Sequence, residues 1–401
     1  MNRFTVRRSA LKASLAGVVG ASFLPRAQAQ KKYGPGISDT EIKIGQTLPY
    51  SGPASAYGQL GRAQLAYFKS LNDRGGINGR KINLISLDDG FSPPKAVEQT
   101  RRLVEQDEVA LIFGTLGTPL NLAIRQYLNA KKVPQLFIAA GSVRFADPVA
   151  FPWTMGWQPT LRGEAMFYAK SILATRPNAK IAAIFQDDDF GKEMVAGLKE
   201  GLADKAAMLI STESFQATDP TIDSQIITMK GTGADTVMLF TYAKQAAQAI
   251  RKIADLGWKA DVYLHLGSAS VGATLQPAGL DKSVGVKTAG FIKDPTDPQW
   301  ANDAELAPFF EWMKKYMPEA NITDSLNISG YAFAQTMEQV LRQCGDDLTR
   351  ENILKQASNL RDVRIGALLP GSLIATSPSD YRVVEHMVLQ RFDGRVWQLV
   401  K

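Results

Sequence analysis

Residues 109–123, VALIFGTLGTPLNLA, join a short apolar run to a turn rich in glycine and threonine. The run at 109–113 has the length and the β-branched and aromatic content of a buried strand. Thr118 and Pro119 then form a helix-start signal, because threonine is a good N-cap and proline suits the first helical position. A strand followed by a helix predicts an α/β fold. The free backbone N–H groups at the start of that helix predict an anion site.

The same alternation of period-two and period-3.6 apolar runs continues on both sides of this stretch. In the first half, we predict strands at 42–48, 82–87, 109–113 and 133–138 and helices at 61–72, 94–106 and 119–130. After the connector DPVAFPWTMGWQPT, at 147–160, we predict strands at 181–185, 208–215, 236–240 and 262–266 and helices at 192–202, 222–230 and 245–256. In the last part, we predict helices at 299–317, 331–344 and 348–357 and a hairpin of strands at 382–390 and 396–400. The pattern indicates two α/β lobes with parallel sheets, binding where strand C-terminal ends from both lobes face one cleft.

The first 29 residues have the three-part order of a bacterial export signal. Basic residues come first, at positions 3, 7, 8 and 12, followed by an apolar stretch at 13–24 and the small-residue pattern Ala27-Gln28-Ala29. The apolar stretch is shorter than the roughly 20 residues that span a bilayer, so we predict cleavage after Ala29. The pair Arg7-Arg8 resembles a twin-arginine signal, although Ala10 stands where that type usually has a bulky apolar residue. We therefore expect export to the periplasm.

The charge of the chain depends strongly on this segment. The 401 residues hold 46 Lys and Arg against 39 Asp and Glu, a net charge of +7. Residues 1–29 hold five of the basic residues and no acidic one, so their removal leaves 41 against 39 and a net charge of +2. This balance gives no argument for nucleic-acid binding. The single cysteine, Cys344, excludes an intramolecular disulfide, and no later segment has the apolar length of a membrane helix, so a soluble protein is expected.

The usual signatures of enzymes and metal sites are missing. The sequence has no dinucleotide-binding glycine pattern, no P-loop, no nucleophile elbow and no H-E-x-x-H. With only His265 and His386, a histidine-rich metal site is not expected, and no cofactor is predicted. We interpret the acidic run at 187–189 as a solvated loop whose last carboxylate favours the next helix start. These features indicate a binding protein rather than an enzyme.

Four stretches could hold a small ligand. The loop at 114–118 lacks the lysine that a P-loop directs at phosphates, so a carboxylate fits its anion site better than a nucleotide does. In VPQLFIAAGSVRF, at 133–145, small residues at a strand end would let a ligand approach the backbone, although close packing explains them equally well. In SGPASAYG, at 51–58, Tyr57 is available to point into a cleft, and NDRGGINGRKI, at 72–82, suits a helix C-cap and tight turn.

Taken together, these stretches resemble the Leu/Ile/Val-binding-protein-like substrate-binding proteins of ABC importers, the type I periplasmic binding proteins. The resemblance covers nearly the whole chain after residue 29 and rests on SGPASAYG, GGINGRK, LDDGFSPPKAVEQTRRLV, the loop at 114–123 and DDDFGKEM. It implies two doubly wound parallel-sheet lobes, joined by a three-segment hinge, that close on a small solute without catalysis. The implied division is a signal at 1–29, an N-terminal lobe at 30–158 plus 292–365, and a C-terminal lobe at 159–291 plus 366–401. The implied partners are a small organic acid and a membrane permease, and a monomer is expected.

The resemblance also implies site residues. Tyr57 matches the aromatic residue of the first loop, and Thr118 matches the hydroxyl residue that binds the ligand carboxylate. Further implied positions are Ala140, Gly141 and Ser142 around the same carboxylate, the second-lobe aromatic residues Phe190 and Tyr242, and Ser268 in the stretch where amino-acid binders place an acidic residue.

Three departures from the amino-acid binders bear on the ligand. Gly117 stands where these proteins often have a disulfide cysteine, and Phe190 replaces a tyrosine. The stretch HLGSASVGA, at 265–273, offers no Asp or Glu to pair with a ligand ammonium, whose unpaired burial would be costly. The connector FPWTMGWQP, at 151–159, resembles the subset that binds aromatic acids. We expect an aromatic carboxylate of the benzoate or phenylpropanoid type; the alternatives are a branched-chain amino acid or amide, and a sensory ligand-binding module.

Overall fold

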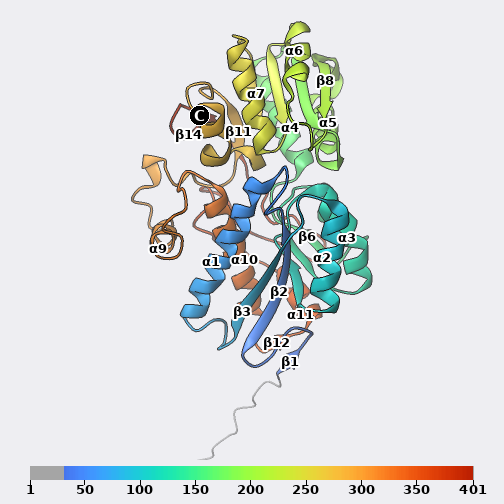
Figure 1. Ribbon diagram of the computed structural model, residues 1–401, viewed down its shortest axis with the longest axis vertical. Helices are drawn as coiled ribbons and strands as arrows, with labels where there is room; N and C mark the ends of the chain where they lie inside the picture. Colours follow the sequence, from blue (N-terminus) through green and yellow to red (C-terminus); the bar gives the residue numbers. More distant parts are fainter. Residues whose placement is uncertain (1–30, 401) are drawn as a thin grey trace, which may run out of the picture. The chain divides into compact units, whose positions relative to one another are not determined.

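A computed structural model of the protein describes residues 31–400 (Figure 1). The predicted export signal at 1–29 lies outside these residues. The described chain contains one sheet of five strands, one of seven, and a short pair formed by β1 Lys32–Tyr33 and β12 Asp347–Leu348. Each of the two large sheets forms the centre of one lobe.

The five-stranded sheet belongs to the first lobe, is wholly parallel and has the order β3-β2-β4-β5-β6. Its strands are β2 Glu41–Leu48, β3 Lys81–Asp88, β4 Leu111–Phe113, β5 Gln135–Ile138 and β6 Thr154–Gly156. The strand order reverses between β2 and β4, as in doubly wound sheets, which bind ligands beside this point. The loop that follows β4 is therefore at the position where a ligand is expected.

Helices cover both faces of this sheet (Figure 1). They are α1 Gly58–Asp73, α2 Pro93–Glu105, α3 Thr118–Ala130, α10 Leu326–Gln343 and α11 Arg350–Ala357. Helix α1 packs on α10, and α2 packs on α3. A Cβ atom at Gly330 of α10 would lie 2.6 Å from the Cβ of Ala63 on α1, so the close approach of these two helices depends on this glycine.

The seven-stranded sheet of the second lobe has the order β14-β13-β11-β10-β9-β7-β8. Its strands are β7 Ile181–Gln186, β8 Leu209–Phe215, β9 Thr236–Phe240, β10 Asp261–Leu264, β11 Lys287–Gly290, β13 Val388–Phe392 and β14 Trp397–Leu399. The helices of this lobe are α4 Leu161–Thr175, α5 Asp189–Leu202, α6 Asp223–Gly231, α7 Ala243–Asp255 and α8 Gln276–Ala278. The predicted C-terminal hairpin is confirmed, and because β13 runs antiparallel to both β11 and β14, this sheet is mixed rather than wholly parallel.

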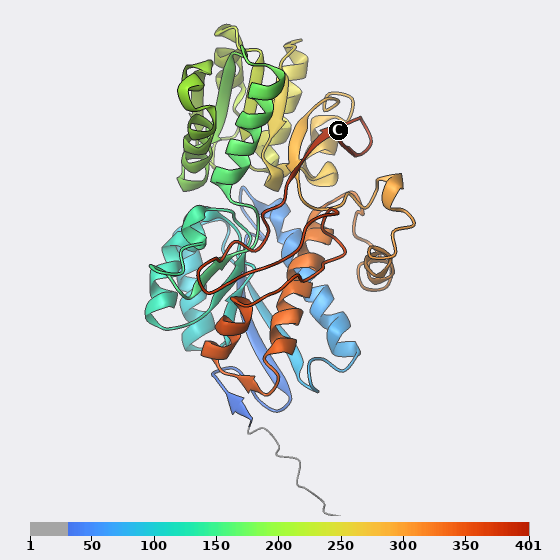
Figure 2. The same cartoon turned by 180° about the vertical axis from the view of Figure 1, so that it is seen from behind.

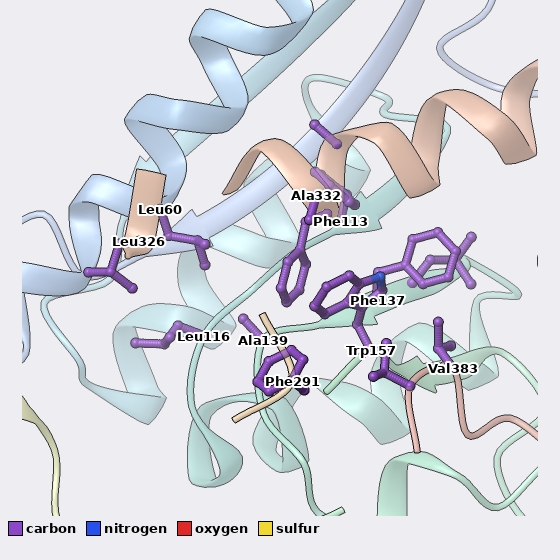
Figure 3. Packing of buried hydrophobic residues seen from close by; sticks show 14 of the residues in the cluster. Leu60, Phe113, Leu116, Phe137, Ala139, Trp157, Phe291, Leu326, Ala332 and Val383 are labelled. Carbon is purple, nitrogen blue, oxygen red and sulfur yellow. The ribbon is translucent and has the colours of Figure 1, made fainter. Parts of the chain in front are cut away.

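The chain passes between the lobes three times, from β6 to α4, from β11 to α10 and from α11 to β13. Each connection contributes an apolar side chain to one buried cluster, namely Trp157, Phe291 and Val383 (Figure 3). The rings of Trp157 and Phe291 lie 6.0 Å apart, and the indole N–H of Trp157 donates to Thr336 Oγ1 at 3.0 Å. The three connections therefore pack into the same apolar cluster as core residues of the lobes.

The third connection lies against the first lobe over most of its length. Thr376 Oγ1 donates to the carbonyl of Ala357 at 2.7 Å, and Tyr381 OH donates to the carbonyl of Pro152 at 3.1 Å. Figure 2 shows this dark red segment passing over the first lobe before it enters the second sheet. We therefore propose that the boundary expected at 365 lies near residue 385, and we keep 158 and 292 as the other proposed limits.

Between residues 42 and 266 the predicted strands and helices all have counterparts within a few residues. The prediction missed strand β6, helix α4 and strand β11, which lie within or beside irregular stretches of the sequence. Helix α10 begins at Leu326 rather than at 331, and the strand predicted from residue 382 begins only at Val388.

The helix predicted at 299–317 is wrong in its first half. A 3-10 turn, η6 Pro298–Trp300, is followed by an irregular stretch and then by α9 Ala307–Tyr316. The side chain of Asp297 accepts from the backbone N–H of Gln299, and Asp303 accepts from that of Glu305. Such local side-chain bonds offer the backbone an alternative to helical pairing.

Candidate functional site

A cavity lies between the two lobes, at the C-terminal ends of strands from both sheets. It contains about 1010 Å³ of space between atoms, part of which is open to solvent. Six of the eight predicted site residues line it: Tyr57, Thr118, Ala140, Gly141, Phe190 and Tyr242. Ser142 and Ser268 do not line it. The predicted location of the site is thus a real cavity, with two of its expected polar contacts missing.

The start of α3 differs from the predicted N-cap. The helix begins at Thr118 itself, and Gly117, whose φ of 88° favours glycine, takes the cap position without a side-chain bond. The hydroxyl of Thr118 therefore does not cap the helix. Its Oγ1 is buried and has no hydrogen-bond partner elsewhere in residues 31–400. Thr118 lines the cavity, so this unpaired hydroxyl and the positive end of the helix lie at the same place.

The strand end after β5 brings the backbone close to the cavity. A Cβ atom at Gly141 would lie 2.2 Å from the carbonyl oxygen of Pro159, so only glycine fits there. The predicted role of Ser142 as a ligand hydroxyl is wrong in this structure. Its Oγ donates to Glu193 Oε2 at 2.6 Å, and the backbone N–H of Val143 donates to Oε1 of the same carboxylate at 2.8 Å. Ser142 therefore connects the first lobe to α5 of the second.

Aromatic rings form one wall of the cavity. The ring of Tyr242 lies 5.4 Å from that of Tyr57, 5.0 Å from that of Phe190 and 5.1 Å from that of Phe91, measured between centroids. Phe91, which follows the DDG turn of the first lobe with a φ of 60°, packs on Tyr242 but does not itself line the cavity. Burial raises the pKa of Tyr242 well above its ordinary value, so its phenol stays neutral near pH 7.

Tyr57 connects the lobes directly. Its hydroxyl donates to the carbonyl of Gly267 at 3.0 Å, lies 3.2 Å from Ser268 Oγ and accepts from the backbone N–H of Ala243 at 3.2 Å. Burial raises the pKa of Tyr57 to about 12, so the phenol keeps its proton near pH 7. Ser268, predicted to face the ligand, instead donates to the carbonyl of Thr241 at 2.6 Å.

A buried polar group that the prediction missed lies on the second-lobe side of the cavity. Glu164 of α4 is completely buried, and His265, which follows β10, lines the cavity. Glu164 Oε2 lies 2.8 Å from His265 Nδ1, and its Oε1 accepts from the N–H of Leu266 at 2.7 Å and from Tyr168 OH at 2.9 Å. A single histidine at the end of a strand was the only sequence signal for this group.

The cavity wall contains one acidic and one basic side chain among residues 31–400. Lys293 Nζ forms an ion pair with Asp303, with 2.7 Å between Nζ and Oδ2. Asp294 accepts from Thr296 N–H at 2.9 Å and from the N–H of Trp397 at 3.3 Å. Apart from these two residues and His265, the wall is built of neutral side chains. Asp294 is therefore a carboxylate of the wall that is held by neutral hydrogen-bond donors.

Among residues 31–400, no group of three or more His, Cys, Asp or Glu side chains is arranged to hold a metal ion. In the same range, no helix combines the length and the hydropathy needed to cross a membrane.

Replacing Tyr57 with phenylalanine should favour a more open arrangement of the two lobes. The change removes the hydroxyl that joins Tyr57 to three second-lobe groups, each net bond being worth about 0.5–1.5 kcal/mol. Small-angle X-ray scattering of the ligand-free variant should show a larger mean radius than that of the unaltered protein. Tyr50→Phe is the matched control, because the Tyr50 hydroxyl bonds to Ser86 within one lobe. Identical scattering from all three proteins would contradict this role.

Comparisons with known proteins agree with this architecture. Residues 41–395 match the family described as periplasmic binding protein. A Leu/Ile/Val-binding protein homolog 7 from Brucella suis biovar 1 (strain 1330) is 24% identical over 83% of this chain and 84% of its own.

Two solved structures are similar in fold. A branched chain amino acid ABC transporter from Thermus thermophilus with bound valine has a TM-score of 0.82 at 15% identity and covers 91% of this chain and 96% of its own. A fatty acid ABC transporter substrate-binding protein from Thermomonospora curvata has a TM-score of 0.77 at 21% identity and covers 92% of this chain and 95% of its own. The family and these neighbours are substrate-binding proteins rather than enzymes. Because the family match spans most of the chain, and the two-lobed fold and the cavity between the lobes agree with it, this protein belongs to the periplasmic binding protein family.

Proposed function

We propose that this chain is exported to the periplasm, captures a small apolar carboxylate and delivers it to a membrane ABC permease. Our leading ligand class is an aromatic acid of the benzoate or phenylpropanoid type. The observation that carries the proposal is the hydroxyl of Thr118, which is buried at the start of α3, lines the cavity and has no partner in residues 31–400. A carboxylate at this point would satisfy the hydroxyl and the helix N–H groups together.

The walls of the cavity support an apolar body for the ligand. Tyr57, Phe190 and Tyr242 present aromatic rings, and Leu60 and Leu116 add aliphatic surface. Stacking on such rings is worth about 0.5–1.5 kcal/mol beyond the burial of area. A ligand with a carboxylate at one end and an aromatic or otherwise apolar body at the other would match both the Thr118 hydroxyl and the apolar walls.

A branched-chain amino acid is the second candidate. The Brucella relative is named a Leu/Ile/Val-binding protein homolog, and the Thermus structure holds valine. The ammonium group of such a ligand would need an acceptor, and Asp294, the one carboxylate on the wall in residues 31–400, already accepts from the backbone N–H groups of Thr296 and Trp397. A sensory module of the same fold is a third candidate, which association with a signalling receptor instead of a permease would support.

A thermal-shift panel on protein freed of bound ligand separates these candidates. It should include benzoate, cinnamate, octanoate, L-leucine, L-isoleucine, L-valine and leucinamide. A ligand present at 100 times its Kd stabilises the folded state by about 2.7 kcal/mol, which is easily measured. We expect aromatic acids to raise the Tm. If leucine, isoleucine or valine raises the Tm and benzoate, cinnamate and octanoate do not, the proposed ligand class is refuted. Native mass spectrometry of the protein as purified would report any ligand it retains, and its monomeric state.

Replacing Thr118 with valine should weaken carboxylate binding by about 1.5–3 kcal/mol, the value of a hydrogen bond to a charged group. The ligand-free protein should keep its Tm, because valine has nearly the same shape and the hydroxyl makes no protein bond to lose. Isothermal titration with the best acid of the panel measures the change. Thr100→Val is the matched control, since Thr100 on α2 also has a fully buried, unpaired hydroxyl but does not line the cavity. Equal affinities of the two variants would show that the Thr118 hydroxyl does not bind the ligand carboxylate.

A further inference from the structure

His265 occupies the second-lobe side of the cavity, whereas Thr118 belongs to the first lobe. The imidazole packs on the ring of Phe190, with 4.7 Å between centroids, and Phe190 in turn packs on Tyr242. The histidine is 6% exposed, so it is almost enclosed but still part of the cavity wall. A ligand held at Thr118 would therefore present its opposite end to the second lobe and to His265.

Glu164 fixes how the imidazole is held. The carboxylate is completely buried and already accepts from the N–H of Leu266 and from Tyr168 OH. Burial, and next the charge of Glu164, raise the pKa of Tyr168 well above its ordinary value, so this phenol stays a donor. Nδ1 of His265 lies 2.8 Å from Glu164 Oε2, so this ring nitrogen is engaged by the carboxylate. Nε2 is then the ring nitrogen that is left for a ligand.

Nε2 has no hydrogen-bond partner among residues 31–400, and a glycine keeps it uncovered. A Cβ atom at Gly267 would lie 2.6 Å from Nε2. Gly267 also lines the cavity, so the missing side chain leaves room for a ligand atom beside this nitrogen. The group is thus a hydrogen-bonding nitrogen of fixed orientation beside the cavity.

We infer that His265, positioned by Glu164, is a specificity-determining residue that forms a hydrogen bond through Nε2 with a hydroxyl at the end of the ligand remote from its carboxylate. The favoured ligand class is then a hydroxylated aromatic acid. This inference rests on the proposed function, because it takes the carboxylate at Thr118 as the other end of the ligand.

The first test uses the unaltered protein. Isothermal titration would compare 4-hydroxybenzoate with 4-fluorobenzoate and benzoate, and 4-hydroxycinnamate with cinnamate. Fluorine is close to a hydroxyl in size but cannot donate. We expect the hydroxylated acid of at least one series to bind roughly tenfold more tightly than its partners, the effect of one well-placed hydrogen bond. Equal affinities within both series would overturn the inference and leave the proposed function standing. Binding of none of these acids would refute the proposed function itself.

The second test uses variants. His265→Asn keeps a donor for Glu164 at the position of Nδ1 and removes Nε2, so it should lose the preference for the hydroxylated acid while still binding the unsubstituted one. His386→Asn is the matched control, because His386 is exposed and should keep the preference. Gly267→Ala places a methyl group 2.6 Å from Nε2, so it blocks or displaces this nitrogen and should also lose the preference; a failure of His265→Asn to fold therefore leaves the test intact. An unchanged preference in either folded site variant would overturn the inference.

Discussion

Replacing Glu164 with alanine should lower the free energy of unfolding by about 3–5 kcal/mol, the typical result of removing one partner of a buried pair. The change leaves the N–H of Leu266 and Nδ1 of His265 without their acceptor in a completely buried place. It also leaves a void where the carboxylate packed. Chemical denaturation of the ligand-free variant measures the loss, and far-UV circular dichroism reports whether the fold persists.

Two further variants make this result interpretable. Glu164→Gln keeps an acceptor for Leu266 but places an amide donor beside other donors, so its loss should be smaller than that of the alanine variant. Glu200→Ala is the matched control, because Glu200 on α5 forms a half-exposed ion pair with Arg162 and such pairs contribute at most about 1 kcal/mol. Similar free energies of unfolding for Glu164→Ala and Glu200→Ala would show that the buried pair stabilises the fold no more than the surface ion pair does.

Replacing Gly141 with alanine should cost about 3 kcal/mol of stability, the upper end for overpacking a close contact, and should also weaken ligand binding. A Cβ atom there would lie 2.2 Å from the carbonyl oxygen of Pro159 and 3.2 Å from the backbone nitrogen of Leu161. These are backbone atoms of the first connection between the lobes, so the hinge itself has to move. Gly141 lines the cavity, and the same displacement would widen the carboxylate end.

Denaturation and ligand titration of Gly141→Ala measure the two effects. Gly231→Ala is the matched control, since a Cβ at this last residue of α6 meets no atom within 4 Å and the backbone there is helical. Alanine should be neutral or slightly stabilising at that helical position. A Gly141→Ala protein with the unaltered Tm and affinity would show that the connection is more adaptable than its packing indicates.

The fold could be predicted from the sequence to a large extent because its signals are local. Alternating apolar periods located the strands and helices between residues 42 and 266, and the Asp393-Gly394 turn located the hairpin. The errors arose where side chains compete with regular structure, as Asp297 and Asp303 do before α9. The prediction missed strand β6, which lies inside the Pro- and Trp-rich connector at 147–160, and helix α4, which begins directly after it.

The sequence by itself predicted the α/β architecture and an anion-favouring helix start at Thr118, because both depend on neighbours within one strand–loop–helix unit. The aromatic residues Phe190 and Tyr242 were positions implied by the family resemblance. The tertiary structure alone decided which polar groups remain free for a ligand. Ser142 is occupied by Glu193, 51 positions away, and His265 is held by Glu164, 101 positions away. Such partners meet only when separate elements pack together, and buried polar groups then take whichever partner lies within hydrogen-bond distance. The sequence named Thr118 as a site residue, but only the tertiary structure shows that its hydroxyl has no partner in residues 31–400.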